Sequence, residues 1–160
     1  MINLYAGSAA GRTSPRQYPE HATVLLVDDH PWVLDSLLEI IETDSTLTVV
    51  ATASRISEAV RKARLWQPEV AVLDVNMPDG GGWAAARALR EVCPGIRLVA
   101  YSSYDEALIT RTITAAGISS YVSKGSDINL LIEAIHGEDV MPEPTEAMPL
   151  MGRTATGGAR

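Results

Sequence analysis

The sequence contains no phenylalanine, a single cysteine and no long apolar run. One cysteine, Cys93, cannot form an intramolecular disulfide, so a disulfide framework is excluded and a reducing, cytoplasmic location is predicted. No stretch approaches the ~18 apolar residues of a membrane span, and the N-terminus lacks the pattern of a signal peptide. Basic residues are outnumbered, with 13 Lys and Arg against 20 Asp and Glu and a net charge of −7. This balance argues against direct nucleic-acid binding.

The two ends of the chain differ in composition from its middle. Residues 1–22 and 137–160 are rich in glycine and proline and show no hydrophobic periodicity, which predicts a flexible leader and a flexible tail. A chain of 160 residues suits one domain whose core is large enough to fold unaided. We therefore expect a single domain over residues 23–136.

Short apolar segments alternate with helical patterns between these ends. The expected strands are residues 23–27, 47–51, 70–73, 97–101 and 120–123. The predicted helices follow Pro31, a cap at Ser54 or Ser57, Gly82, and a cap at Ser126 or Asp127. With a further helix before the last strand, five strand–helix repeats indicate an α/β fold in which helices cover a parallel sheet.

That further helix, over residues 108–114, is predicted from its bounds. Its β-branched residues locally resemble a strand. An acidic start at Asp105 and Glu106 and a glycine stop at Gly117 nevertheless favour a helix. A helix with such low intrinsic propensity depends on tertiary packing, which suits it to be a moving part.

Charged residues follow three of the expected strands. Asp28 and Asp29 come directly after the first strand, Asp74 after the third and Lys124 after the fifth. The carboxyl ends of parallel strands meet at one edge of a sheet, where ligands bind. Clustered carboxylates repel one another unless a cation lies between them, and their hard oxygen atoms suit Mg²⁺. The sequence therefore predicts a Mg²⁺ site that receives a phosphate group.

These residues resemble the receiver domain of bacterial two-component response regulators. The resemblance also includes Met77-Pro78-Asp79-Gly80 after Asp74, Ser102 after the fourth strand and Tyr121 on the fifth, and it covers residues 23–136. It is strongest to the NarL/LuxR-type subgroup, which usually carries a helix-turn-helix output domain. The resemblance implies a doubly wound, flavodoxin/CheY-like sheet of five parallel strands in the order 2-1-3-4-5.

The resemblance implies a phosphoacceptor rather than an enzyme. Asp74 would be the nucleophile that takes a phosphoryl group from a sensor histidine kinase or a phosphotransfer protein, with self-catalysed transfer and slow autodephosphorylation. Mg²⁺ would be held by Asp29, by Asp74, by the backbone carbonyl of Asn76 and, through water, by Asp28.

Other residues would bind the phosphoryl group or respond to it. Lys124 and Ser102 would each contact a phosphoryl oxygen, and Ser102 and Tyr121 would form the switch. Asn76 and Tyr104 would overhang the phosphoryl group and set its lifetime. Phosphorylation would shift the surface around the fourth helix, the fifth strand and the last helix towards a protein partner or a homodimer.

Each site residue also has a structural interpretation. Asp28 suits a helix start, Lys124 a solvated surface, Ser102 a turn and Tyr121 the core. His30 is interpreted as a helix-start residue, because the phosphodonor histidine should lie on the partner.

Three other functions stay open. The chain could be the receiver fragment of a DNA-binding regulator, or an interaction module that never takes phosphate. It could also be a haloacid-dehalogenase-type hydrolase, but such enzymes require a second acidic residue at the position of Asn76. We expect a single-domain receiver that acts through protein contacts.

Overall fold

The computed structural model describes residues 21–78, 80–103, 116–138 and 140. Its elements are β1 (Ala22–Val27), α1 (Pro31–Ile41), β2 (Leu47–Ala53), α2 (Ile56–Trp66), β3 (Val70–Leu73), α3 (Gly81–Val92), β4 (Arg97–Ser102), β5 (Ser120–Ser123) and α5 (Ile128–His136). The helix predicted over residues 108–114, Tyr104, and most of the predicted leader and tail lie outside the described residues.

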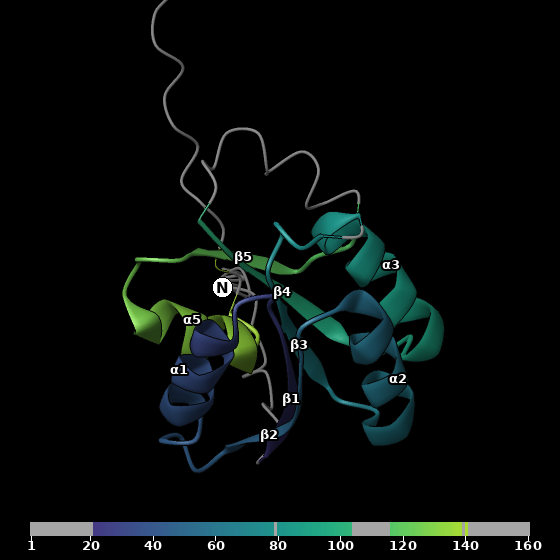
Figure 1. The fold of residues 1–160 in the computed structure, drawn as a ribbon. Helices are drawn as coiled ribbons and strands as arrows, with labels where there is room; N and C mark the ends of the chain where they lie inside the picture. Colours follow the sequence, from purple (N-terminus) through teal and green to yellow (C-terminus); the bar gives the residue numbers. More distant parts are fainter. Residues whose placement is uncertain (1–20, 79, 104–115, 139, 141–160) are drawn as a thin grey trace, which may run out of the picture.

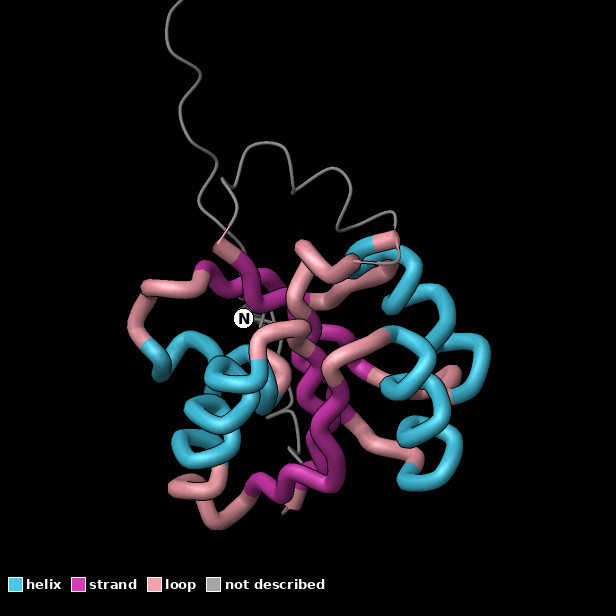
Figure 2. The backbone as a smooth tube through the Cα atoms, in the orientation of Figure 1, coloured by secondary structure: helices cyan, strands magenta, loops and turns pink. Residues whose placement is uncertain are grey.

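Five parallel strands form one sheet in the order β2-β1-β3-β4-β5, which confirms the predicted order. Helices α1 and α5 cover one face of this sheet, and α2 and α3 cover the other (Figure 1). The strands form the central layer between these two helical layers (Figure 2). The architecture is therefore a doubly wound α/β fold. None of the described helices is long and apolar enough to cross a membrane.

Side chains of the central strands alternate between two apolar clusters. Leu25 and Ala71 pack in the cluster beneath α2 and α3, whereas Leu26 and Val72 pack in the cluster beneath α1 and α5. All four residues of β3 are buried. Because both faces of these strands are covered, they form continuous apolar runs without polar alternation, and that pattern predicted them from the sequence.

The structure moves several predicted boundaries by one or two residues. β1 begins one residue earlier, at Ala22, β2 extends to Ala53, and β4 extends to Ser102. The predicted cap of α5 is confirmed, because the Asp127 side chain accepts a hydrogen bond from the backbone N–H of Asn129.

The predicted cap of α2 is wrong. The N-cap is Arg55, which makes no side-chain capping hydrogen bond, and Ser57 lies inside the helix. The backbone N–H of Ser54 instead donates to Glu58 Oε2 at 3.1 Å, so an acidic side chain of the first turn binds the chain that enters the helix. This contact pairs the amide that precedes the N-cap, and the Arg55 side chain caps none of the N–H groups of the first turn.

The turn after α1 is stabilised by an ionised carboxylate. Asp44 accepts a hydrogen bond from Thr46 Oγ1 at 2.6 Å and lies 2.9 Å from His136 Nε2 on α5. The Thr46 hydroxyl, with a smaller contribution from His136, lowers the pKa of Asp44 from 3.8 to about 2.

The pKa of Asp44 is lower in the folded protein than in the unfolded chain, so its ionised carboxylate stabilises the fold at pH values above the unfolded pKa. The contribution of Asp44 should therefore be lost as the pH falls from about 4 to about 2. In urea unfolding across that pH range, the free energy of unfolding should fall more steeply in the wild type than in Asp44→Asn. Equal slopes for the two proteins would contradict this interpretation.

Candidate functional site

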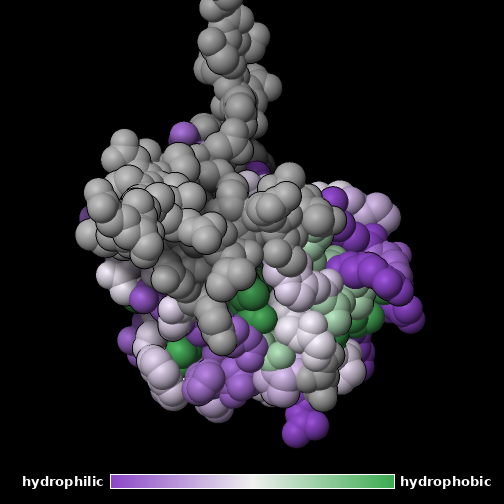
Figure 3. Space-filling view, turned by 90° about the horizontal axis from the view of Figure 1, so that it is seen from above, coloured by the Kyte–Doolittle hydropathy of each residue, from purple (hydrophilic) through white to green (hydrophobic). Residues whose placement is uncertain are grey.

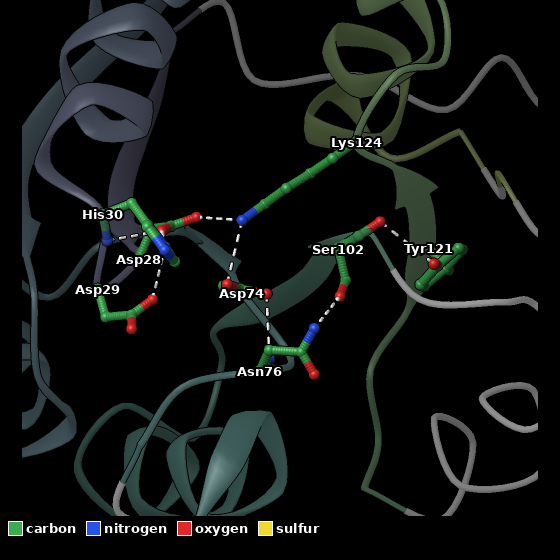
Figure 4. A network of polar contacts seen from close by, with 8 residues as sticks. All are labelled: Asp28, Asp29, His30, Asp74, Asn76, Ser102, Tyr121 and Lys124. Carbon is green, nitrogen blue, oxygen red and sulfur yellow. Dashed lines mark hydrogen bonds and ion pairs between the residues drawn. The ribbon is translucent and has the colours of Figure 1, made fainter.

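The carboxyl ends of four strands meet at one edge of the sheet (Figure 4). The last residues of β1 and β3, Val27 and Leu73, are register partners, so the residues that follow them, Asp28 and Asp74, are neighbours. Ser102 ends β4 and pairs with Ser123 on β5, after which the chain continues to Lys124. Parallel pairing therefore brings together residues that lie 96 positions apart in the sequence, such as Asp28 and Lys124.

Lys124 joins two buried carboxylates. Its Nζ atom lies 2.5 Å from Asp28 Oδ2 and 3.1 Å from Asp74 Oδ2, and each Asp side chain is only 3% exposed. Burial lowers the pKa of Lys124, but the hydrogen bonds with the two carboxylates raise it by a larger amount, so the net shift is upward. The ammonium is therefore charged and compensates part of the negative charge at this edge.

Asp29 and His30 complete the acidic cluster. His30 is the N-cap of α1, as predicted, and its Nδ1 atom lies 2.8 Å from Asp29 Oδ1 and 3.1 Å from Asp28 Oδ1. Asp29 Oδ1 is buried and accepts no well-directed hydrogen bond from the described residues. One ligand atom from each of Asp28, Asp29, His30 and Asp74 lies within 4.8 Å of the others. The set offers oxygen ligands to a divalent cation.

The turn after β3 orients the Asp74 carboxylate. Its Oδ1 atom accepts a hydrogen bond from the backbone N–H of Asn76 at 3.0 Å, while its Oδ2 atom faces Lys124. The Asn76 side-chain amide lies 3.5 Å from Ser102 Oγ, which brings the buried Ser102 hydroxyl to the same edge. Asn76 thus links the tips of β3 and β4.

Tyr121 points into the protein in this structure. Its side chain is 2% exposed, and its hydroxyl donates to the backbone carbonyl of Ser102 at 3.3 Å. It packs in the apolar cluster beneath α2 and α3. The core position expected of an aromatic residue is thus observed, and the switch role stays a prediction.

Sequence reasoning missed Tyr101, which lies beside the Lys124 side chain. Lys124 Nζ is 5.9 Å from the centroid of the Tyr101 ring. Burial raises the pKa of the Tyr101 hydroxyl, Lys124 lowers it and Asp28 raises it again. The sequence alone does not reveal this contact. It depends on which face of β4 the Tyr101 side chain occupies, which follows from the alternation of side chains along the strand.

Gly82 allows α3 to begin directly against the turn that follows Asp74. Its backbone N–H donates to the carbonyl of Val75 at 2.9 Å. A Cβ atom at this position would lie 2.9 Å from Val75 Cα and 3.3 Å from the carbonyl oxygen of Asp74. Only glycine fits there without displacing the backbone that carries the Asp74 carboxylate.

We therefore expect Gly82→Ala to lower the free energy of unfolding by about 2 kcal/mol, the cost of an overpacked contact with backbone. Gly95→Ala is the matched control, because a Cβ atom at Gly95 meets nothing within 4 Å. Urea unfolding of both variants measures the difference. Similar free energies for the two variants would show that the close approach at Gly82 is not constraining.

Comparison with known proteins identifies the family. A family model described as the response regulator receiver domain matches residues 24–136. The chain belongs to this family. Receiver domains are signalling domains of two-component systems rather than classical enzymes, and the family in general accepts phosphate on an aspartate and binds Mg²⁺ at an acidic pocket.

The relatives of this receiver domain are response regulators. The DNA-binding transcriptional activator DevR/DosR of Mycobacterium tuberculosis is 40% identical over 103 residues, which are 63% of this chain and 46% of that protein. The nitrate/nitrite response regulator protein NarL of Escherichia coli K12 is 31% identical over 144 residues, 86% of this chain and 67% of NarL. This receiver domain thus spans about half the length of DevR/DosR.

Solved structures show the same architecture. A LuxR-family two-component response regulator from Aurantimonas aligns with a TM-score of 0.70 at 33% identity, covering 78% of this chain and 91% of that one. The signal receiver domain of the putative response regulator NarL from Mycobacterium tuberculosis aligns with a TM-score of 0.66 at 25% identity, and the alignment covers 74% of this chain and 99% of that one. Both the sequence and the fold of this receiver domain therefore agree with the resemblance found from its motifs.

Proposed function

We propose that this receiver domain accepts a phosphoryl group on Asp74 from the phosphohistidine of a sensor kinase or phosphotransfer protein. The observation that carries the proposal is the Asp74 carboxylate itself, buried but bound at one oxygen by the Asn76 N–H and at the other by the Lys124 ammonium. Both contacts stabilise the ionised, nucleophilic form of a carboxylate at a sheet edge where ligands bind.

In the proposed transfer, one oxygen of Asp74 forms a bond to phosphorus while the phosphorus–nitrogen bond of the donor breaks. The electron pair of that bond returns to the imidazole nitrogen of the donor, which then takes up a proton. Such transfers depend on positioning and charge neutralisation. Lys124, already 3.1 Å from Asp74 Oδ2, is placed to contact a phosphoryl oxygen, and the buried Ser102 hydroxyl is placed to contact another.

The acidic cluster fits a divalent cation. Three carboxylates and a single ammonium leave an excess of negative charge, and the buried Asp29 Oδ1 accepts no well-directed hydrogen bond within the described part of the chain. Asp29, Asp74 and the backbone carbonyl of Asn76 would hold Mg²⁺ directly, with Asp28 acting through water. When bound, Mg²⁺ would supply charge neutralisation at the phosphoryl oxygens.

Asn76 and Tyr121 have the subsidiary roles in this proposal. The Asn76 side chain stands between Asp74 and Ser102, where it would limit the access of water to the acyl phosphate, a role we also propose for Tyr104. Movement of Ser102 towards the phosphoryl group would alter the hydrogen bond between its carbonyl and the Tyr121 hydroxyl. That coupling would carry the phosphorylation state to the surface around β5 and α5, for a protein partner or a second copy.

A second candidate concerns the output rather than the chemistry. Because this chain spans 46% of DevR/DosR, a DNA-binding transcriptional activator, it could be the receiver part of a longer transcriptional regulator. The phosphoacceptor role would be the same in both cases.

Incubation with Mg²⁺ and acetyl phosphate tests the proposed function. One phosphoryl group should be taken up per chain and separated by phosphate-affinity electrophoresis, with no uptake in Asp74→Asn. Asp35→Asn, which removes an exposed acid on α1, is the control and should be phosphorylated normally. Rapid hydrolysis of p-nitrophenyl phosphate would indicate a hydrolase instead, and no uptake by the wild type would indicate an interaction module.

A further inference from the structure

Apolar and charged side chains adjoin one another on this molecule. Seen from above, the side that carries α2 and α3 shows hydrophobic residues directly beside strongly hydrophilic ones (Figure 3). At the edge of the sheet that carries Asp74, a contact of this kind joins Tyr101 to Lys124, whose Nζ atom lies over the tyrosine ring at 5.9 Å from its centroid. A cation within about 6 Å of a ring centroid is attracted by the negative face of the ring. Lys124 therefore has an uncharged partner in addition to Asp28 and Asp74.

The sheet fixes the position of this ring. Tyr101 lies on β4, where Val122 of β5 is its register partner, and its side chain packs against the apolar cluster beneath α1 and α5. The backbone N–H of Lys124 donates to the carbonyl of Ser102, the residue after Tyr101, at 2.8 Å. The lysine thus leaves the backbone directly beside β4, and its ammonium lies over a ring that two strands and a packed core hold in place.

The two charged partners of Lys124 would both change during the proposed reaction. Mg²⁺ would bind Asp74 directly and Asp28 through water, which weakens the attraction of these carboxylates for the ammonium. One oxygen of Asp74 would then become bonded to phosphorus. The face of an aromatic ring is not a ligand for Mg²⁺, which binds oxygen atoms, and it takes no part in the transfer. Burial raises the pKa of the Tyr101 hydroxyl, so the ring also stays neutral near pH 7.

We propose that Tyr101 is a positioning residue whose ring keeps the Lys124 ammonium at this edge while Mg²⁺ and the phosphoryl group occupy the acids. The inference rests on the proposed function, because it gives the ring a part in phosphoryl transfer to Asp74. The ring acts through the lysine and contacts neither the metal nor the phosphoryl group. Its removal should therefore matter only where Lys124 is present.

Proton NMR of the full chain labelled with carbon-13 lysine tests the contact without phosphorylation. The chain has two lysines, Lys62 and Lys124, and the replacement of Lys62 by arginine assigns their signals. The ring current of Tyr101 should shift the ε-methylene protons of Lys124 upfield of their position in the urea-unfolded chain. This upfield shift should persist when Mg²⁺ is added, be lost in Tyr101→Leu and be kept in Tyr101→Phe. The Lys62 signals should stay in place throughout.

Two results of this experiment would overturn the proposal. The first is a wild-type Lys124 signal at its position in the unfolded chain, which needs no variant to observe. The second is a loss of the upfield shift on addition of Mg²⁺, since the ring would then release the lysine when the cation binds.

The rate of phosphorylation by acetyl phosphate with Mg²⁺ tests the consequence for the reaction. Tyr101→Leu should react about two- to fivefold more slowly than the wild type, and Tyr101→Phe should react at the wild-type rate. In a Lys124→Met background, the addition of Tyr101→Leu should leave the rate unchanged, because the group on which the ring acts is gone.

Equal slowing by Tyr101→Leu in both backgrounds would overturn the proposal, because the ring would then act through the fold rather than through Lys124. Slowing by Tyr101→Phe as large as that by Tyr101→Leu would overturn it as well, since the hydroxyl and not the ring would be responsible. No uptake by the wild type would contradict the proposed function instead, and the lysine signals would still decide whether the ring holds the ammonium.

Discussion

Replacing Lys124 with methionine is expected to lower the free energy of unfolding by about 3 kcal/mol in the absence of divalent cations. The lysine Nζ atom lies between the carboxylates of Asp28 and Asp74, at 2.5 Å and 3.1 Å, and both side chains are 3% exposed. Methionine keeps an unbranched apolar chain of similar length but removes the positive charge. Two buried carboxylates would then face each other without a counter-charge, which is the costly way to disrupt a buried ion pair.

Lys62→Met provides the matched control. Lys62 also pairs with a carboxylate, Glu58, but both side chains are partly exposed, and its Nζ atom donates a further hydrogen bond to the Thr52 carbonyl at 2.6 Å. Its loss should therefore cost about 1 to 2 kcal/mol, less than the loss of Lys124. Urea unfolding of both variants should be measured with and without Mg²⁺. The cation should recover more stability in Lys124→Met than in the wild type, because it replaces the missing charge between the acids. Equal destabilisation by the two substitutions would show that Lys124 does not compensate the acidic cluster.

Asp29→Asn should have opposite effects on stability and on cation binding. Lys124 bonds to Asp28 and Asp74 rather than to Asp29, one carboxylate oxygen of which lies within 4.8 Å of a ligand atom of each other acid in the cluster. Neutralising Asp29 therefore relieves repulsion, and the free energy of unfolding should rise by about 1 kcal/mol without Mg²⁺. The same change removes a charged ligand, so Mg²⁺ should bind about tenfold more weakly or worse.

Two measurements check this trade-off. Urea unfolding without divalent cations gives the change in stability, and titration with Mg²⁺ monitored by tryptophan fluorescence gives the change in affinity. Asp35→Asn, at an exposed position on α1, should alter neither quantity. A less stable Asp29→Asn protein would mean that the contact between Asp29 and His30 outweighs the repulsion among the acids.

The sheet could be predicted from the sequence because its strands are buried on both faces. The run Val70–Leu73 contains only apolar residues and is followed at once by Asp74, so both the strand and the place where it ends were visible. Helix caps were harder to predict, because several residues can satisfy the first turn. Asp127 does cap α5, whereas the N-cap of α2 is Arg55, without a side-chain hydrogen bond, and the Glu58 carboxylate binds the Ser54 amide before the helix instead.

The site could be predicted as a set of residues but not as a set of contacts. Placing Asp28, Asp74 and Lys124 at the ends of parallel strands is enough to bring them to one edge. Which acid pairs with Lys124 depends on side-chain directions after β1, and the sequence cannot distinguish Asp28 from Asp29 in this respect. In the structure Lys124 pairs with Asp28, and Asp29 lies against His30. The contact of Tyr101 with Lys124 likewise depends on which face of β4 it occupies.

The central claim is that Asp74 is the residue that carries the phosphoryl group. Its most direct test is to phosphorylate the full chain with acetyl phosphate and Mg²⁺, reduce the acyl phosphate with borohydride, and map the reduced residue by mass spectrometry. We expect residue 74 alone to be converted to homoserine. Conversion at Asp28 or Asp29, or a phosphoryl group found on His30, would contradict the claim.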